Sequence, residues 1–331
     1  MDAACVALAR TAGAVILGKT ATVEFGATRP CNTTNPHNIQ HTPGGSSSGS
    51  AAAVADGQIL LATGTQTGGS IIRPAAFCGV VGFKPGFGAI SPAGTKGYAW
   101  SLDTVGAFAT CIADVSLFFD VLRGARTSQL LPTLSTAPRI GVFLGPFADR
   151  AESAAIEVIE YVAASCSRAG ASVRDVHSPT AFEQTLEWHR CISRYEMGRS
   201  LMPEQQSDNA VKLGSVLHQE IERGQQVDER MYREAKVCRL ELSAIFDTLM
   251  TQNDVLLTLA TPGEAPRGLE NTGDATFNLS WSLLGLPCLS LPVAFGSSRL
   301  PLSVQLVGTR HDDRALLEAA NWIENTALHC K

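Results

Sequence analysis

Residues 58–84, "QILLATGTQTGGSIIRPAAFCGVVGFK", constrain the fold more than any other part of this 331-residue sequence. An apolar, strand-like stretch (58–64) leads into a Gly-rich turn, a short helical stretch "SIIRPAAF" and a second strand-like stretch (79–84). Strands that alternate with helices in this way are typical of α/β proteins, in which the strands are buried on both faces. We therefore predict an α/β fold.

The rest of the sequence continues this alternation. Further strands are predicted at 14–19, 139–144, 172–176, 254–262, 288–295 and 302–308. Further helices are predicted at 2–12, 47–56, 152–168 and 312–325, and residues 181–250 are mainly charged amphipathic helix. Because the late strands would complete a sheet that begins early in the chain, we predict one domain over residues 1–331 rather than two.

Composition excludes several classes of function. The formal net charge is -5 and the sequence contains no basic run, which argues against a nucleic-acid partner. No apolar stretch reaches the roughly 18 residues that span a bilayer. The nine cysteines are scattered singly, which is typical of reduced thiols in a cytoplasmic protein, and the seven histidines stand apart, so we expect no metal site.

Residues 13–20, "GAVILGKT", match the phosphate-binding pattern GxxxxGK[ST]. A phosphate-binding loop follows a strand and opens a helix at the lysine. Here a helix is predicted before the motif, and its four central residues are apolar and strand-like. We therefore interpret Lys19 as a structural residue at the end of a strand rather than as a nucleotide ligand.

Two Gly-Gly-Ser elements, at 44–46 and 68–70, each precede a predicted helix. A serine in this position lies among unpaired N–H groups at the positive end of the helix dipole. Preceding glycines leave room for those N–H groups to converge on an oxyanion. Each serine alone could be an ordinary helix cap. Two such elements, separated by a helix and a strand, favour catalysis.

The two elements and their surroundings, "GGSSSGSAAAVADG" and "ATGTQTGGSIIRPAAFCGVVGFKPGFG", resemble the signature of the amidase signature family. "AGAVILGKTATVEF" upstream and "LGLPCLSLPV" downstream extend the resemblance over nearly the whole chain. It implies an amide hydrolase with a Ser–cis-Ser–Lys triad on a large mixed, twisted β-sheet flanked by helices on both faces. It also implies a signature core at 13–110 and a variable, substrate-side helical region at 181–250.

The resemblance assigns roles to individual residues. Ser70 is expected to be the nucleophile, and Ser46 the bridging serine that follows a cis peptide bond after Gly45. The expected oxyanion hole consists of the backbone amides of Thr67, Gly68, Gly69 and Ser70.

The family's base is a lysine in a Val-Lys-Asp-like segment upstream of "AGAVILGKT", and this sequence does not contain that segment. Neither Lys19 nor Lys84 matches its position. Two hypotheses therefore stand side by side: an amide hydrolase that forms a seryl acyl-enzyme, and a truncated, catalytically impaired remnant that would be poorly soluble or nearly inactive. An amidotransferase-type subunit is a third alternative.

Two departures from the family pattern bear on the substrate. Gln66 stands where most members have aspartate, and Arg73 lies three residues after Ser70 rather than two. This variant resembles malonamidases, in which the arginine holds a substrate carboxylate. The alternative is an arginine in a structural ion pair or at a helix surface. We expect a small-molecule amide as partner, no cofactor, no metal and no membrane, with a homodimer as the assembly to consider.

Overall fold

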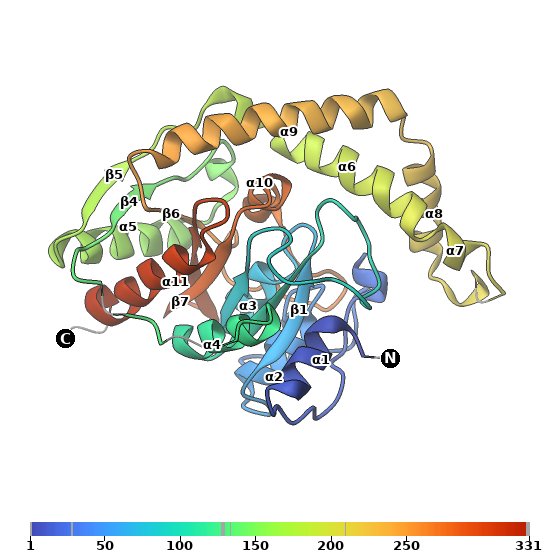
Figure 1. Ribbon diagram of the computed structural model, residues 1–331, viewed down its shortest axis with the longest axis horizontal. Helices are drawn as coiled ribbons and strands as arrows, with labels where there is room; N and C mark the ends of the chain where they lie inside the picture. Colours follow the sequence, from blue (N-terminus) through green and yellow to red (C-terminus); the bar gives the residue numbers. More distant parts are fainter. Residues whose placement is uncertain (1, 28, 127–129, 133, 209, 329–331) are drawn as a thin grey trace.

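The computed structural model describes residues 2–328 except 28, 127–129, 133 and 209 (Figure 1). Its strands are β1 (Ala62–Gln66), β2 (Val81–Lys84), β3 (Thr104–Ala109), β4 (Arg139–Val142), β5 (Ser172–Asp175), β6 (Val255–Leu259), β7 (Cys288–Phe295) and β8 (Pro301–Val307). Its α-helices are α1 (Ala4–Thr11), α2 (Ser48–Ala55), α3 (Ile72–Cys78), α4 (Ile112–Leu122), α5 (Ser153–Arg168), α6 (Thr185–Ser200), α7 (Met202–Gln205), α8 (Ser215–Gln225), α9 (Glu229–Met250), α10 (Thr276–Leu284) and α11 (Asp313–Trp322).

The strands form one eight-stranded sheet in the order β1-β3-β2-β7-β8-β6-β4-β5. Strand β4 runs parallel to β5 and β6, whereas the remaining neighbours pair antiparallel. The mixed sheet that the family resemblance implied is thus confirmed. Strands from the two halves of the sequence are neighbours in this sheet, where β2 pairs with β7.

Helices cover both faces of this sheet. Along β6, Val255, Leu257 and Leu259 pack in the core shared with α4, α5 and α11, whereas Leu256 points into the core shared with α9 and α10. Side chains of a strand alternate between the two faces, so an unbroken apolar run is what a doubly covered strand requires. The second face is the one that carries α3 and α10, the helices of the site described below.

The predicted strand at 14–19 is wrong. These residues have no regular secondary structure and are exposed, with Val15 at 83% and Leu17 at 73% of their full exposure. After Ala14 N–H donates to Ala9 O, the described backbone contacts include no ladder partner for residues 15–19. Apolar composition alone cannot make a strand where no neighbouring strand supplies hydrogen bonds.

The motif around Lys19 remains unlike a phosphate-binding loop, because α1 precedes it and no α-helix opens at the lysine.

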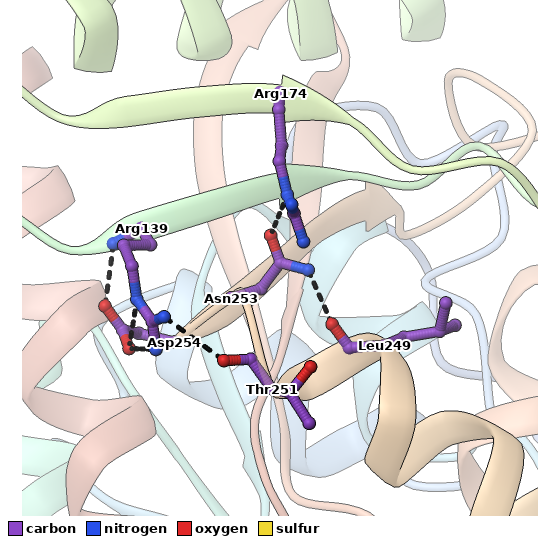
Figure 2. Close-up of polar contacts among 6 residues, drawn as sticks. All are labelled: Arg139, Arg174, Leu249, Thr251, Asn253 and Asp254. Atoms are coloured by element: carbon purple, nitrogen blue, oxygen red, sulfur yellow. Dashed lines mark hydrogen bonds and ion pairs between the residues drawn. The ribbon is translucent and has the colours of Figure 1, made fainter.

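Helices α6 to α9 form a layer on one side of the molecule, opposite α1 and α2 (Figure 1). The segment 251–254, between α9 and β6, is bound to strands β4 and β5 by polar contacts (Figure 2). The Arg139 guanidinium donates to Asp254 Oδ1 at 2.6 Å and to Thr251 O at 3.2 Å, and Arg174 Nε donates to Asn253 Oδ1 at 3.0 Å. Among the described helices, none is both long enough and apolar enough to cross a membrane.

Candidate active site

Ser46 lies in a buried loop immediately before α2. The peptide bond between Gly45 and Ser46 is cis, as the family resemblance predicted. Val23 N–H donates to Ser46 O at 3.1 Å, and Ser48 Oγ donates to Gly44 O at 2.7 Å, which fixes the loop on both sides of the serine. Only 7% of Ser46 is exposed.

Ser70 lies in the turn between β1 and α3. Ser47 N–H donates to Ser70 O at 3.3 Å, so the two Gly-Gly-Ser elements are neighbours in space. Unlike Ser46, Ser70 is only partly buried, so it lies on the more open side of the pair. The structure therefore brings together the two Gly-Gly-Ser elements that the sequence singled out.

Thr67, the first residue of the predicted oxyanion turn, is held at two points. Its hydroxyl donates to Asp103 Oδ1 at 2.5 Å, and its carbonyl oxygen lies 2.9 Å from His189 Nε2 on α6. Because a carbonyl only accepts, His189 carries its proton on Nε2. In a planar trans peptide the N–H points opposite to the C=O, so holding Thr67 O directs the N–H of Gly68 away from α6.

Burial governs the ionisation of both partners of Thr67. Burial lowers the pKa of His189 to about 4, so the imidazole is neutral at pH 7. Burial also raises the pKa of Asp103, against the hydrogen bonds from Thr67 and from the backbone of Tyr98 and Ala99. Neutral His189 donates to the turn without adding positive charge to it.

The low pKa of His189 predicts a loss of stability in acid. Unfolded histidine has a pKa near 6.5, so between about pH 6.5 and pH 4 the unfolded chain binds a proton that the folded chain rejects. The free energy of unfolding should therefore decrease as the pH is lowered through this window. At pH 5 it should be about 2 kcal/mol smaller than at neutral pH. We expect His189→Gln, which keeps a donor for Thr67 O, to lose less stability than the unmodified protein between pH 7.5 and pH 5 in urea titrations. Parallel losses in the two proteins would contradict the assignment.

Gly69 packs against a buried amide of α10. A methyl group placed on Gly69 Cα would lie 2.4 Å from Asn278 Oδ1. Asn278 Nδ2 donates to Ala260 O at 3.0 Å and to Gln305 Oε1 at 3.3 Å, so the oxygen of this amide must face Gly69. Asn278 Oδ1 is buried and has no hydrogen-bond partner among the described residues. Only glycine therefore fits beside this amide.

Arg73 is buried in the first turn of α3. Its Nη2 donates to Gly45 O at 2.7 Å and its Nη1 donates to Gly273 O at 2.8 Å, so it joins the Ser46 loop to the segment before α10. Its Nε is buried without a partner among the described residues. Burial lowers the pKa of Arg73 to about 10, opposed by the charge of Asp274, so the guanidinium is charged at pH 7.

Three lysines make contacts that involve neither Ser46 nor Ser70. Lys84, at the end of β2, donates to Pro85 O at 2.9 Å, and burial lowers its pKa. Lys96 pairs with Glu204, and Lys236 lies over the ring of Tyr232. Lys19 is exposed. None of these contacts identifies a lysine as the general base for Ser46 and Ser70.

Sequence reasoning missed four of the groups around the turn: Asp103, His189, Asn278 and Ser282, whose Oγ lies 2.5 Å from Gly68 O. Asp103 precedes a strand that was not predicted, and His189 belongs to the helical region 181–250, whose charged composition hides a single buried imidazole. Asn278 and Ser282 have the i, i+4 spacing that places two polar residues on one helix face, and this spacing inside an apolar segment was the available clue.

Comparisons with known proteins agree on one family. The family model described as Amidase matches residues 1–317. The chain is similar to a glutamyl-tRNA(Gln) amidotransferase subunit of Synechococcus sp. (strain WH7803), with 33% identity over 366 residues, 96% of this chain and 75% of the relative.

Solved structures show the same relationship. A crystal structure of an amidase superposes with a TM-score of 0.88 and 28% identity, covering 98% of this chain and 77% of the other. The peptide amidase PAM, in complex with the competitive inhibitor chymostatin, superposes with a TM-score of 0.82 and 27% identity, covering 98% and 77%.

Proposed function

The chain belongs to the amidase family, and from this premise we propose that it hydrolyses a small carboxamide through a seryl acyl-enzyme with Ser70 as the nucleophile. Ser46 takes the proton of the Ser70 hydroxyl as Ser70 attacks, and passes its own hydroxyl proton to the leaving amine. The backbone amides of Thr67, Gly68, Gly69 and Ser70 stabilise the oxyanion.

One observation carries this proposal above the others. Ser70 is only partly buried, and it follows a turn in which two carbonyl oxygens are hydrogen-bonded: Thr67 O by His189, and Gly69 O by the N–H of Arg73 at 2.9 Å. Because each C=O is bound on one side, the N–H of the same peptide points to the other side. These contacts support a turn that presents amides rather than carbonyl groups beside Ser70, as stabilisation of a tetrahedral oxyanion requires.

Trapping of the acyl-enzyme tests the proposal directly. The full chain is incubated with a panel of small carboxamides, and ammonia release is measured beside intact-protein mass spectrometry after an acid quench. We expect one acyl group per chain, located by peptide mapping at Ser70. An acyl group on another residue would overturn the assignment of the nucleophile.

Arg73 supports a substrate that carries a carboxylate. Arginine has five N–H donors, and two of them bind Gly45 O and Gly273 O. The remaining donors belong to a buried, charged side chain close to Ser70 in the sequence. A carboxylate would satisfy them through charge-assisted hydrogen bonds. Such a substrate would also fit the malonamidase-like subgroup, whereas the relatives named above are amidases and a subunit of an amidotransferase.

Replacement of Arg73 should separate charged from neutral substrates. Arg73→Ala also releases the two backbone carbonyl groups, and this structural effect is the same for every substrate. The KM for carboxylate-bearing amides should therefore rise about 10- to 150-fold more than the KM for matched neutral amides, the equivalent of roughly 1.5–3 kcal/mol. Equal changes for both classes would show that Arg73 acts only as a structural link.

A second candidate is a binding protein or impaired member of the family, favoured by the hydrogen bond that Lys84 Nζ donates to Pro85 O rather than to either serine. A third is an amidotransferase subunit, favoured by the 33% identity to such a subunit. The acylation experiment separates them: absence of acylation with every carboxamide favours the second, and acylation by glutamine alone favours the third.

The cytoplasm remains the compartment we propose, since the cysteines at 5, 31, 78, 111, 166, 191, 238 and 288 are free.

A further inference from the structure

Gln66, the last residue of β1, is buried directly behind the turn that carries Ser70. Its Oε1 accepts hydrogen bonds from Ile71 N–H at 2.7 Å and from Ile72 N–H at 3.0 Å. These N–H groups belong to the start of α3, where a helix leaves its first donors without internal partners. Because both partners are donors, the atom that faces α3 must be the oxygen, and Nε2 must point the other way.

The opposite side of the Gln66 amide meets Ser282 on α10. Gln66 Nε2 lies 3.0 Å from Ser282 Oγ, and Ser282 Oγ lies 2.5 Å from Gly68 O. A serine hydroxyl has one hydrogen, and Gly68 O can only accept, so the hydroxyl donates to Gly68. Ser282 Oγ must then accept from residue 66, which requires a donor there. Each bond in this chain has one permitted direction.

We propose that Gln66 and Ser282 form a directed hydrogen-bond relay that positions Gly68 and the first turn of α3 around Ser70, and that the relay requires a neutral amide at residue 66. With Gly68 O held by Ser282, the N–H of Gly69 points away from α10, because C=O and N–H lie on opposite sides of a planar trans peptide. The relay rests on the proposed function of Ser70 as nucleophile. Gln66 and Ser282 are positioning residues, since neither contacts the reacting atoms.

Gln66→Glu separates this relay from a simple helix cap. The two side chains have the same shape, and a carboxylate accepts from Ile71 and Ile72 at least as well as an amide does. A carboxylate cannot donate to Ser282, so the hydroxyl must turn toward residue 66 and release Gly68 O. If Gln66 acted only as a cap, Gln66→Glu would keep full activity.

We expect Gln66→Glu to lower kcat about 10- to 100-fold at pH 8 with KM changed less than threefold, because misplaced oxyanion donors cost the transition state more than the bound substrate. The kcat relative to that of the unmodified protein should rise as the pH falls, because protonation of the introduced carboxylate restores a donor for Ser282. Ser282→Ala should lower kcat by a similar factor, and adding it to Gln66→Glu should cause less than a twofold further loss. The matched control is Ser280→Ala on the same helix, whose hydroxyl lies 2.7 Å from Thr185 Oγ1, and its kcat should stay unchanged.

Unchanged kcat in Gln66→Glu at pH 8, or multiplicative losses in the double variant, would overturn the relay. Unfolding measurements test the relay if the unmodified protein hydrolyses none of the amides tested, a result that would contradict only the proposed function of Ser70.

These measurements form a double-mutant cycle of Gln66→Met and Ser282→Ala. We expect the change in the unfolding equilibrium constant of the double variant to differ about fivefold or more from the product of the changes in the two single variants. A joint effect equal to that product would overturn the relay in that case.

Discussion

Ser70→Ala is expected to remove measurable amide hydrolysis while leaving the protein folded. The oxyanion turn and substrate positioning would remain, and in other serine hydrolases these alone supply about 10³–10⁴-fold over the reaction in water, far below normal turnover. The hydrogen bond between the two Gly-Gly-Ser elements joins Ser47 N–H to the carbonyl oxygen of Ser70, and alanine keeps this carbonyl. The free energy of unfolding should therefore change by no more than about 0.5 kcal/mol.

Initial rates of ammonia release and a urea titration on the same preparation check both halves of this expectation. Ser46→Ala is the informative companion, because loss of a proton relay costs about 10²–10⁴-fold rather than all activity. Ser298→Ala, an exposed serine whose recorded hydrogen bonds are made by its backbone N–H, is the matched control. Turnover by Ser70→Ala at the unmodified rate would exclude Ser70 as the nucleophile.

The order of the central elements could be predicted because local sequence and tertiary environment agree there. Residues 58–84 combine an apolar run, a Gly-rich turn and a second apolar run, and the structure places β1, α3 and β2 in that order. The bounds moved: β1 begins at Ala62, because Leu60 is 80% exposed and lies before the ladder with β3 begins.

The strand predictions were wrong where the presence or absence of a neighbouring strand decides the structure. Residues 14–19 are as apolar as a buried strand but lack a ladder, whereas "TVGAFA" forms β3 between β1 and β2 although glycine interrupts its pattern. Gly106 is required there, since a methyl group on it would lie 2.2 Å from Phe83 O. A close approach of two backbones cannot be inferred from either segment alone.

The site shows the same division between local and distant information. Ser46, Ser70 and the glycines beside them belong to two short motifs, so they could be proposed as site residues from the sequence. The groups that orient them come from elsewhere: Asp103 from the turn before β3, His189 from α6, and Ser282 from α10. The contacts of Arg73 with Gly45 and Gly273 also required the structure, because the sequence indicated only a charge near Ser70.

Gly69→Ala is expected to be the most damaging substitution in the turn that leaves every catalytic group chemically intact. The new methyl group would lie 2.4 Å from Asn278 Oδ1 and 3.0 Å from Ala275 Cβ, so either the turn or α10 must shift. The Asn278 amide cannot retreat easily, because Ala260 O and Gln305 Oε1 hold its nitrogen. Overpacking of this kind costs about 1–3 kcal/mol of stability. If the turn forms the proposed oxyanion hole, displacement of its amides by a fraction of an ångström should lower kcat about 100-fold.

A second substitution distinguishes this steric cause from general damage to the fold. Asn278→Ala removes the obstructing oxygen, so Gly69→Ala combined with Asn278→Ala should have a higher kcat than Gly69→Ala alone, although the protein also loses the two hydrogen bonds of Asn278 Nδ2. Gly18→Ala is the matched control, because nothing lies within 4 Å of a methyl group at that position. Steady-state kinetics and urea titrations on these four variants provide the test. If Asn278→Ala restores no activity to Gly69→Ala, the packing of α10 against the turn does not set the position of the oxyanion amides, and the turn must be held by its carbonyl contacts alone.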